Sequence, residues 1–311
     1  MISANYITEW AAEHPWCASE QVEQDLLIAR ALVAIFSDPF LKERLAFRGG
    51  TALHKLYFSP QARYSEDIDL VQIAPAPFGP IFDHLKRALD FLPNMKRVQK
   101  TFNNSLRFKA ESSIPPIVPI KIKVETNCKE HFTELGHVEL PFTVENGWFA
   151  GACQITTFHL EELLGTKLRA LYQRKKGRDL FDLQYALDRA SIDCDVVMRC
   201  FARYMTFSVG YVPSRGMFEE NMAIKLAMPE FMDDTMNYLD QAYHLIPRRV
   251  GNLSGRNSFE AKRNPVHELE LSGAVSGRAA VVRRKNKGSP AKTHKKESWI
   301  ICLSLLHTIR N

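Results

Sequence analysis

Apolar and polar positions along the first half of the chain predict alternating helices and strands. Apolar residues at helical spacing predict helices over residues 20–37 and 78–91, and a short helix from Thr51 through Leu56. Alternating or short apolar runs predict strands at 45–47, 67–73, 97–102, 106–110 and 119–127. We expect a turn at Asn103 and Asn104, between the third and fourth strands. This order predicts a βαβ-like opening and a mixed sheet flanked by helices.

From residue 159 onward the pattern changes to the helical period and stays helical to about residue 245. The clearest segment has leucines at positions 160, 163, 164, 168 and 171. We therefore predict an α+β fold in three parts: a mixed α/β domain over 1–158, a helical C-terminal lobe over 159–246, and a tail over 247–311.

Charge separates the tail from the rest of the chain. Residues 247–311 hold 14 basic and 4 acidic residues, which leaves 27 basic and 31 acidic residues for 1–246. The tail is rich in Gly, Ser, Arg and Lys and has little periodicity, so we expect it to be disordered. It is either a non-specific nucleic-acid arm or a dispensable extension.

Other features exclude several classes of protein. The chain has no apolar run of about eighteen residues that would span a membrane. Its first ten residues lack the basic segment, followed by an apolar run, that is typical of a signal peptide. Its six cysteines lack the spacing of metal ligands or of a disulfide framework. These observations predict a cytoplasmic protein with reduced thiols.

A Gly-Gly turn is the first candidate for chemistry. Gly49 and Gly50 follow a predicted strand and precede the helix that is expected to begin at Thr51. Glycines let backbone amides approach phosphate oxygens closely, and a helix N-terminus adds positive potential. We therefore expect Gly49, Gly50 and Thr51 to hold phosphates, although taken alone the turn is equally consistent with a simple loop.

The second candidate is a pair of carboxylates in the segment that begins at Ser65, fourteen residues after Thr51. Period-two alternation places Asp67 and Asp69 on the same face of a strand, while Ile68 points to the other face. Two neighbouring carboxylates are hard to ionise together without a cation, and Mg²⁺ prefers hard oxygen ligands. The pair thus predicts a Mg²⁺ site, or Mn²⁺ in its place; the alternative is an Asp pair in a surface turn.

Two further residues have alternative interpretations. Glu125 lies on the polar face of its strand, where it is either a third metal ligand or a solvent-facing residue paired with a lysine. Lys167 lies on the edge of the leucine stripe, where it either has a charged partner or extends its ammonium group to water.

Residues 48–53 (RGGTAL) and 63–70 (RYSEDIDL) resemble the first motif of the AbiEii type nucleotidyltransferase toxins, in the DNA polymerase β-like superfamily. Residues 167–174 (KLRALYQR) and 178–183 (RDLFDL) resemble a later motif of that family. The resemblance implies a nucleotidyltransferase-like fold. It also implies metal-dependent transfer of a nucleotide from a nucleoside triphosphate to an acceptor, with release of pyrophosphate.

The resemblance also assigns roles to residues. It implies that Asp67, Asp69, Lys167 and Asp182 are catalytic, that Glu125 joins the two first Asp residues at the metal, and that Gly49, Gly50, Thr51, Ser65 and Arg63 bind the nucleotide. Arg63 is equally consistent with an ordinary surface arginine. Asp179 and Asp182 also fit the start of a helix, with Asp179 as its N-cap.

Members of the family are abortive-infection toxins with a separate antitoxin, and the similar MenT-type toxins extend the 3′ end of tRNA. We therefore expect an RNA acceptor, tRNA in particular. Three alternatives remain open at this point: a small antibiotic-type acceptor, which would call for an acidic pocket, a protein hydroxyl, and a nucleotide-binding partner module without catalysis. The presence of Asp67, Asp69 and Lys167 argues against the last of these.

Overall fold

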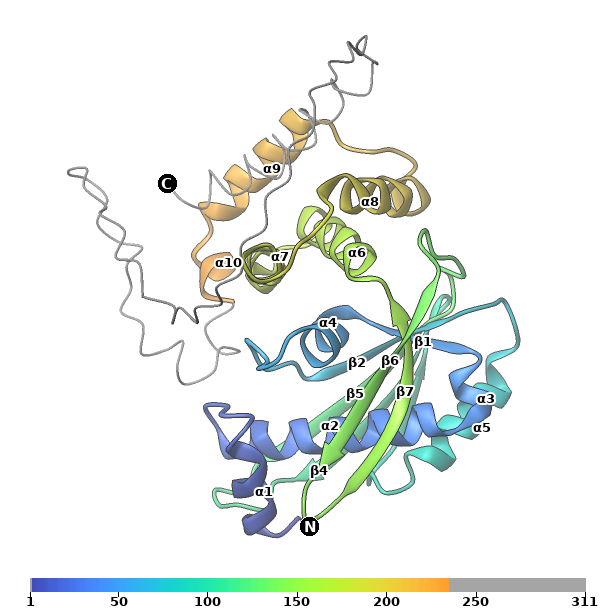
Figure 1. Cartoon of the computed structure of the whole chain (residues 1–311), viewed down its shortest axis with the longest axis vertical. Coiled ribbons are helices and arrows are strands. Elements are labelled where there is room, and N and C mark those ends of the chain that lie inside the picture. The colour runs from blue at the N-terminus through green and yellow to red at the C-terminus, as the bar shows by residue number, and fades with distance from the viewer. Residues whose placement is uncertain (1, 235–311) are drawn as a thin grey trace, which may run out of the picture. The chain divides into compact units, whose positions relative to one another are not determined.

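The computed structural model of this protein describes residues 2–234 (Figure 1). The predicted tail over 247–311, and the last residues of the predicted helical lobe, lie outside the described residues. The predicted nucleic-acid role of the tail therefore stays a prediction.

A seven-stranded mixed sheet forms the centre of the described region. Its strands lie in the order β3-β4-β5-β2-β1-β7-β6. Strands β2 and β5 pair in parallel, as do β1 and β7, and all other neighbours are antiparallel. The strands span β1 Leu45–Arg48, β2 Asp67–Gln72, β3 Lys96–Gln99, β4 Asn103–Glu111, β5 Pro119–Asn127, β6 His137–Glu145 and β7 Ala150–Phe158.

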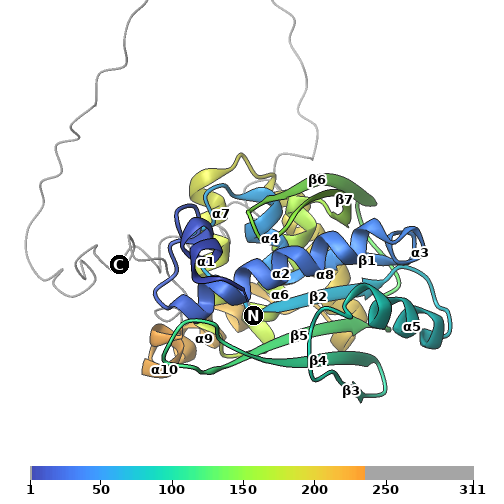
Figure 2. The same ribbon diagram turned by 90° about the horizontal axis from the view of Figure 1, so that it is seen from below.

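Helix α2 covers one face of the sheet, as Figures 1 and 2 show, and contacts strands β2, β5, β6 and β7. It is long and apolar enough to form the main core, since Leu26, Ile28, Leu32 and Ile35 are all fully buried. Three other helices contact it. The four span α1 Ala4–Ala11, α2 Ser19–Ser37, α3 Pro39–Lys42 and α5 Phe78–Ala88.

Helices α6 to α10 lie on the other side of α4 from α2 (Figure 1). Helix α4 connects β1 to β2 and contacts α6, which in turn packs against α7, α8 and α9. The leucine stripe of α6 explains this packing, because Leu163, Leu164, Leu168 and Leu171 are buried. These helices span α4 Gly49–Tyr57, α6 Leu160–Gln173, α7 Gly177–Arg189, α8 Cys194–Val209, α9 Arg215–Leu226 and α10 Pro229–Asp233.

The predicted mixed sheet with flanking helices is confirmed, but three local predictions are wrong. The opening is not a βαβ unit, because β1 and β2 pair antiparallel. The turn after β3 is centred before Asn103, whose carbonyl accepts a hydrogen bond from the amide of Lys100 at 2.8 Å, so Asn103 and Asn104 already belong to β4. Helix α4 begins at Gly49 rather than at Thr51.

The hairpin of β6 and β7 was not anticipated from the sequence pattern. Pro141 interrupts the run that forms β6, and a proline normally argues against a central strand. Strand β6 lies at the edge of the sheet, however, where a missing backbone donor on the outer side costs little.

Among residues 2–234, none of the helices combines the length and the apolar character needed to cross a membrane. The cysteines of this region, at positions 17, 128, 153, 194 and 200, form no disulfide with one another.

Candidate active site

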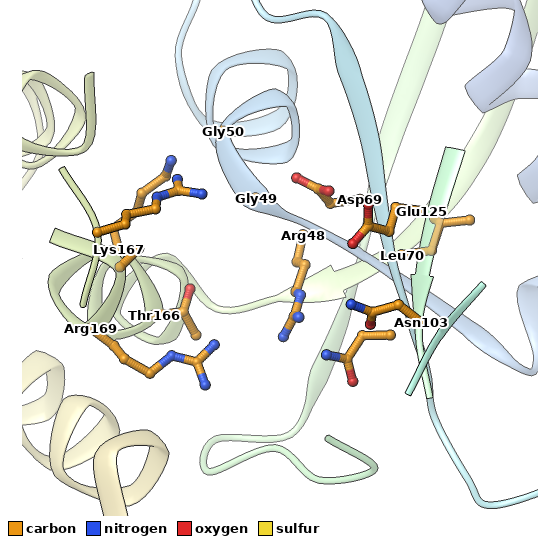
Figure 3. Close-up of a pocket in the computed structure, with 13 residues that line it drawn as sticks. Arg48, Gly49, Gly50, Asp69, Leu70, Asn103, Glu125, Thr166, Lys167 and Arg169 are labelled. Atoms are coloured by element: carbon orange, nitrogen blue, oxygen red, sulfur yellow. The ribbon is translucent and has the colours of Figure 1, made fainter. Parts of the chain in front are cut away.

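Strands β2 and β5 bring three carboxylates to one face of the sheet. Asp67 and Asp69 alternate with Ile68, which is fully buried on the opposite face. The parallel register of β2 and β5 pairs Asp69 with Glu125, and Figure 3 shows these two side chains beside each other. The structure thus places all three predicted metal ligands together.

Lys123 is the positive partner of this group. Its Nζ lies 3.0 Å from Asp67 Oδ2 and 3.1 Å from Glu125 Oε2. Burial, and then the charge of Asp67, raise the pKa of Asp69 above its usual range. Asp69 is therefore a carboxyl group whose ionised form needs a nearby cation.

The three side chains fit a divalent cation by their chemistry. Within residues 2–234 no three acidic, His or Cys side chains form a ready-made metal site. The set at β2 and β5 nevertheless consists of carboxylate oxygens only, which Mg²⁺ prefers. A cation that bound here would take over from Lys123 the neutralisation of Asp67 and Glu125.

The two glycines of the turn are required because neighbouring side chains approach their backbone closely. Gly49 has a φ of +83°, and a Cβ at this position would lie 2.4 Å from Asp69 Oδ2. A Cβ at Gly50 would lie 2.4 Å from Arg63 Nη2 and 3.3 Å from Lys167 Nζ. The turn therefore brings the N-terminus of α4 next to both a carboxylate and a lysine. Neither position 49 nor position 50 has space for a side chain.

A pocket of about 230 Å³ lies between the carboxylates and α6. Figure 3 shows Asp69 and Glu125 on one side, with Lys167 and Arg169 on the other. Such a pocket offers separate surfaces for a metal and for phosphate groups. It is lined by Arg48, Gly49, Gly50, Asp69, Leu70, Asn103, Glu125, Asn127, Thr166, Lys167, Arg169, Ala170 and Arg174.

Lys167 is held at this pocket by two buried carboxylates. Its Nζ lies 2.8 Å from Asp182 Oδ2 and 3.1 Å from Asp179 Oδ1, and the residue is 6% exposed. The alternative in which Lys167 extends its ammonium group to bulk water is therefore wrong. A lysine in this position presents a fixed positive charge to the pocket.

Asp182 does not line the pocket but lies behind Lys167. It is fully buried and accepts hydrogen bonds from Arg63 Nε at 2.6 Å and Nη2 at 2.7 Å, and His54 Nε2 lies 2.8 Å from it. Burial alone would raise the pKa of Asp182, but the charges of Arg63 and Lys167 hold it well below its usual range. Arg63 is thus a buried partner of Asp182 and not a surface arginine.

Asp179 connects two of the pocket's cations. Arg174 donates to its two carboxylate oxygens at 2.6 and 2.7 Å, and Lys167 contacts it as well. Burial opposes ionisation, but Lys167 and Arg174 lower the pKa of Asp179. The expectation that Asp179 is an N-cap is wrong: Lys176 holds that position, and Asp179 lies inside the first turn of α7, where its carboxylate binds side chains.

Glu130 holds the other two arginines of the pocket, Arg48 and Arg169, as Asp179 holds Arg174. The half-buried guanidinium groups of Arg48, from β1, and Arg169, from α6, both form ion pairs with its carboxylate. Burial would raise the pKa of Glu130, but these two arginines lower it to about 2. The carboxylate therefore stays ionised and holds both arginines at the edge of the pocket.

Thr51 and Ser65, predicted to bind the nucleotide, do not line the pocket. Their hydroxyl oxygens lie 2.7 Å apart, and Thr51 also donates to the carbonyl of Asp67. They connect α4 to the start of β2, so in this structure they position the Gly-Gly turn relative to Asp67.

The sequence pattern did not predict roles for Arg48, Arg169 and Arg174, which line the pocket, or for Lys123, which pairs with the carboxylates beside it. Arg174 follows Lys167 by seven residues but lies just beyond α6, at its C-cap, where the backbone is extended, so helical spacing does not place its side chain. The others are brought in by the sheet register or by Glu130, and local spacing does not reveal these contacts.

Lys167→Met is expected to fold but to lose nucleotide transfer by about a hundredfold or more, because the pocket loses a fixed charge aimed at phosphates. The variant should still fold because Asp182 retains its ion pair with Arg63, and Asp179 retains its ion pair with Arg174. The assays are the transfer rate and thermal unfolding, with Lys86→Met on the exposed face of α5 as the matched control. Near-normal transfer by Lys167→Met would show that the lysine is structural only.

A family model described as nucleotidyl transferase AbiEii toxin, type IV toxin-antitoxin system, matches residues 30–252, a range that contains every pocket residue. A comparison with curated proteins found no match.

Two solved structures match the chain at low sequence identity. MenT4, a nucleotidyltransferase toxin from Mycobacterium tuberculosis H37Rv, matches with a TM-score of 0.50 and 17% identity, over 78% of this chain and 92% of that one. JHP933 from Helicobacter pylori matches with a TM-score of 0.42 and 15% identity, over 73% of this chain and 97% of that one.

Proposed function

Because the chain belongs to the family of AbiEii nucleotidyltransferase toxins of type IV toxin-antitoxin systems, we propose that it uses Mg²⁺ to transfer a nucleotide from a nucleoside triphosphate to RNA. The acceptor that we propose is the 3′ end of a tRNA. A separate antitoxin is the expected partner, and the cytoplasm is the expected location, since both substrates are found there.

The observation that carries this proposal is the opposition of charges across one pocket. Asp69 and Glu125 face Lys167 and Arg169 across the pocket (Figure 3). Arg174 also lines the pocket. A triphosphate needs fixed positive charge along its oxygens, and a divalent metal needs carboxylate oxygens near the phosphate that reacts. The pocket supplies both within about 230 Å³.

The residues of this chain divide the work between binding and orientation. Asp67, Asp69 and Glu125 would hold the metal, which when bound supplies Lewis-acid polarisation of the reacting phosphate. Gly49 and Gly50 leave the first amides of α4 accessible to phosphate oxygens. Lys167 provides fixed positive charge where the departing pyrophosphate becomes more negative.

The buried network behind the pocket acts by positioning. Asp182, paired with Arg63, fixes the position of Lys167, and Asp179 fixes Arg174. Preorganised charges are effective because they do not have to reorient during the reaction. We therefore assign Asp182 and Arg63 to orientation of Lys167 and not to direct contact with the nucleotide.

The test is a transfer assay with the purified full-length chain. Each labelled nucleoside triphosphate is incubated with total cellular RNA, with and without Mg²⁺, and the products are separated by size. We expect label in RNA of tRNA size, only with Mg²⁺ and only from a subset of the nucleotides. Label in protein, in a small molecule or in no product would contradict the RNA acceptor.

A further inference from the structure

We propose that the acceptor RNA docks in single-stranded form on a rim beside the pocket, with one base stacked on the exposed ring of Phe102. We define the rim as Phe102, Lys129, Phe132, Arg203 and Phe207. The inference rests on the proposed function, because it assumes that the acceptor is RNA.

Phe102 lies directly outside the pocket. Its carbonyl accepts a hydrogen bond from the amide of Cys128 at 2.8 Å, which extends the β4–β5 ladder by one step. The next pair in that ladder is Asn103 with Asn127, and both residues line the pocket. A chain end that reaches the metal ligands therefore passes close to Phe102.

The ring of Phe102 is available for stacking. Phe102 is 51% exposed, whereas Phe132 and Phe207 are half-buried. A large apolar ring at the mouth of a polar pocket has no role in binding phosphates or a metal. A nucleobase, however, stacks on an aromatic ring with little regard to sequence.

Each of the three aromatic rings of the rim has a cation or another ring beside it. Lys129 Nζ lies 5.2 Å from the ring centre of Phe102 and 5.4 Å from that of Phe207. Phe207 lies 4.9 Å from Phe132, and the guanidinium carbon of Arg203 lies 4.5 Å from the ring centre of Phe132. Both Lys129 and Arg203 are exposed, so each can also meet a phosphate.

This combination favours single-stranded RNA over other partners. Aromatic rings interleaved with basic groups bind the bases and the backbone of a flexible strand at the same time. The rim also joins two parts of the fold, since Phe102 and Lys129 flank strands β4 and β5 while Arg203 and Phe207 come from α8. A strand that lies across both parts would lead one of its ends into the pocket, and the proposed transfer requires this to be the 3′ end.

The first test measures RNA affinity in the absence of any nucleoside triphosphate. The probe is a labelled single-stranded RNA of about ten nucleotides, followed by fluorescence anisotropy. Phe102→Ala is expected to weaken binding by about tenfold or more, and Phe102→Trp to retain or improve it, because the indole preserves the stacking surface. The same affinity for Phe102→Ala and wild type would overturn the proposal and point to a different partner for this ring.

Ile117 provides a matched control. It is 55% exposed and lies beyond the opposite end of the same β4–β5 pair, which is itself eight residue steps or about 27 Å long. Ile117→Ala removes a comparable exposed apolar side chain, so RNA affinity should not change. An equal loss in Ile117→Ala and Phe102→Ala would mean that the effect is not local to the rim, and would refute the assignment.

Lys129→Gln gives a readout that a structural role would not produce. If Lys129 neutralises one RNA phosphate, the slope of log affinity against log salt should become shallower by about 0.7. An unchanged slope would exclude Lys129 from the phosphate contacts and count against the proposal.

Nucleotide binding separates this inference from the proposed function. Thermal stabilisation by a nucleoside triphosphate with Mg²⁺ should be the same in wild type, Phe102→Ala and Lys129→Gln, since none of these changes touches the pocket lining. If wild type transfers nucleotides to RNA but Phe102→Ala binds RNA normally, the rim is wrong and the proposed function stands. If wild type neither binds nor modifies RNA, both fail.

Discussion

Asp69→Asn is expected to reduce nucleotide transfer to background while the metal-free protein melts at the same or a higher temperature. Asp69 lies between Asp67 on its own strand and Glu125 on the next strand, and its pKa is raised by burial and by Asp67. Replacement by Asn removes a like charge, which should relieve repulsion in the apo state. It also removes a carboxylate oxygen that would bind the metal.

The measurements are the transfer rate, the melting temperature without metal, and the rise in melting temperature on addition of Mg²⁺. Asp67→Asn should also abolish transfer, but its apo stability should rise less, because Asp67 forms an ion pair with Lys123. Asp83→Asn, on the exposed face of α5, is the matched control and should behave as wild type. Full activity of Asp69→Asn would show that β2 does not carry the metal site.

Asp182→Ala should produce the largest loss of stability, about 3–5 kcal/mol, because it leaves buried positive charge without compensation. Arg63 would lose both of its carboxylate hydrogen bonds, and Lys167 would lose the nearer of its two partners. Chemical denaturation measures the effect. Asp188→Ala, on the exposed part of the same helix, makes the same chemical change and should cost less than about 0.5 kcal/mol.

The stability difference between wild type and Asp182→Ala should depend on pH in a defined direction. The folded-state pKa of Asp182 lies well below that of an unfolded aspartate, about 3.9. Its contribution is therefore complete above about pH 4 and is lost as the pH falls towards the folded-state pKa. The two unfolding free energies should converge in acid. A constant difference across this range would mean that the loss comes from packing and not from charge.

Much of the fold and part of the site follow from local sequence. The alternation of Asp67, Ile68 and Asp69, and the leucine stripe of α6, each depend on residues within one element. Such periodicity survives in any tertiary context that buries one face, and for this reason the position of these side chains was predictable. The Gly-Gly turn was equally visible, although the start of α4 was displaced by two residues.

Other features depend on contacts between distant segments. Glu125 had two possible interpretations until the register of β2 and β5 placed it opposite Asp69. Arg63 and Asp182, separated by 119 residues, form a buried ion pair. From the sequence alone, Arg63 was equally consistent with an ordinary surface arginine. A strand or helix shows which face a side chain occupies, but not which other element packs against that face.

By itself, the sequence determined the mixed sheet with flanking helices, the carboxylate pair, the glycine turn and the helix that carries Lys167, because each is encoded in short-range spacing. The tertiary structure alone decided that Lys123 neutralises Asp67 and Glu125, and that Glu130 holds Arg48 and Arg169, 82 and 39 residues away from it. These are charges whose energy depends on distance and burial, and both quantities exist only once the chain has folded.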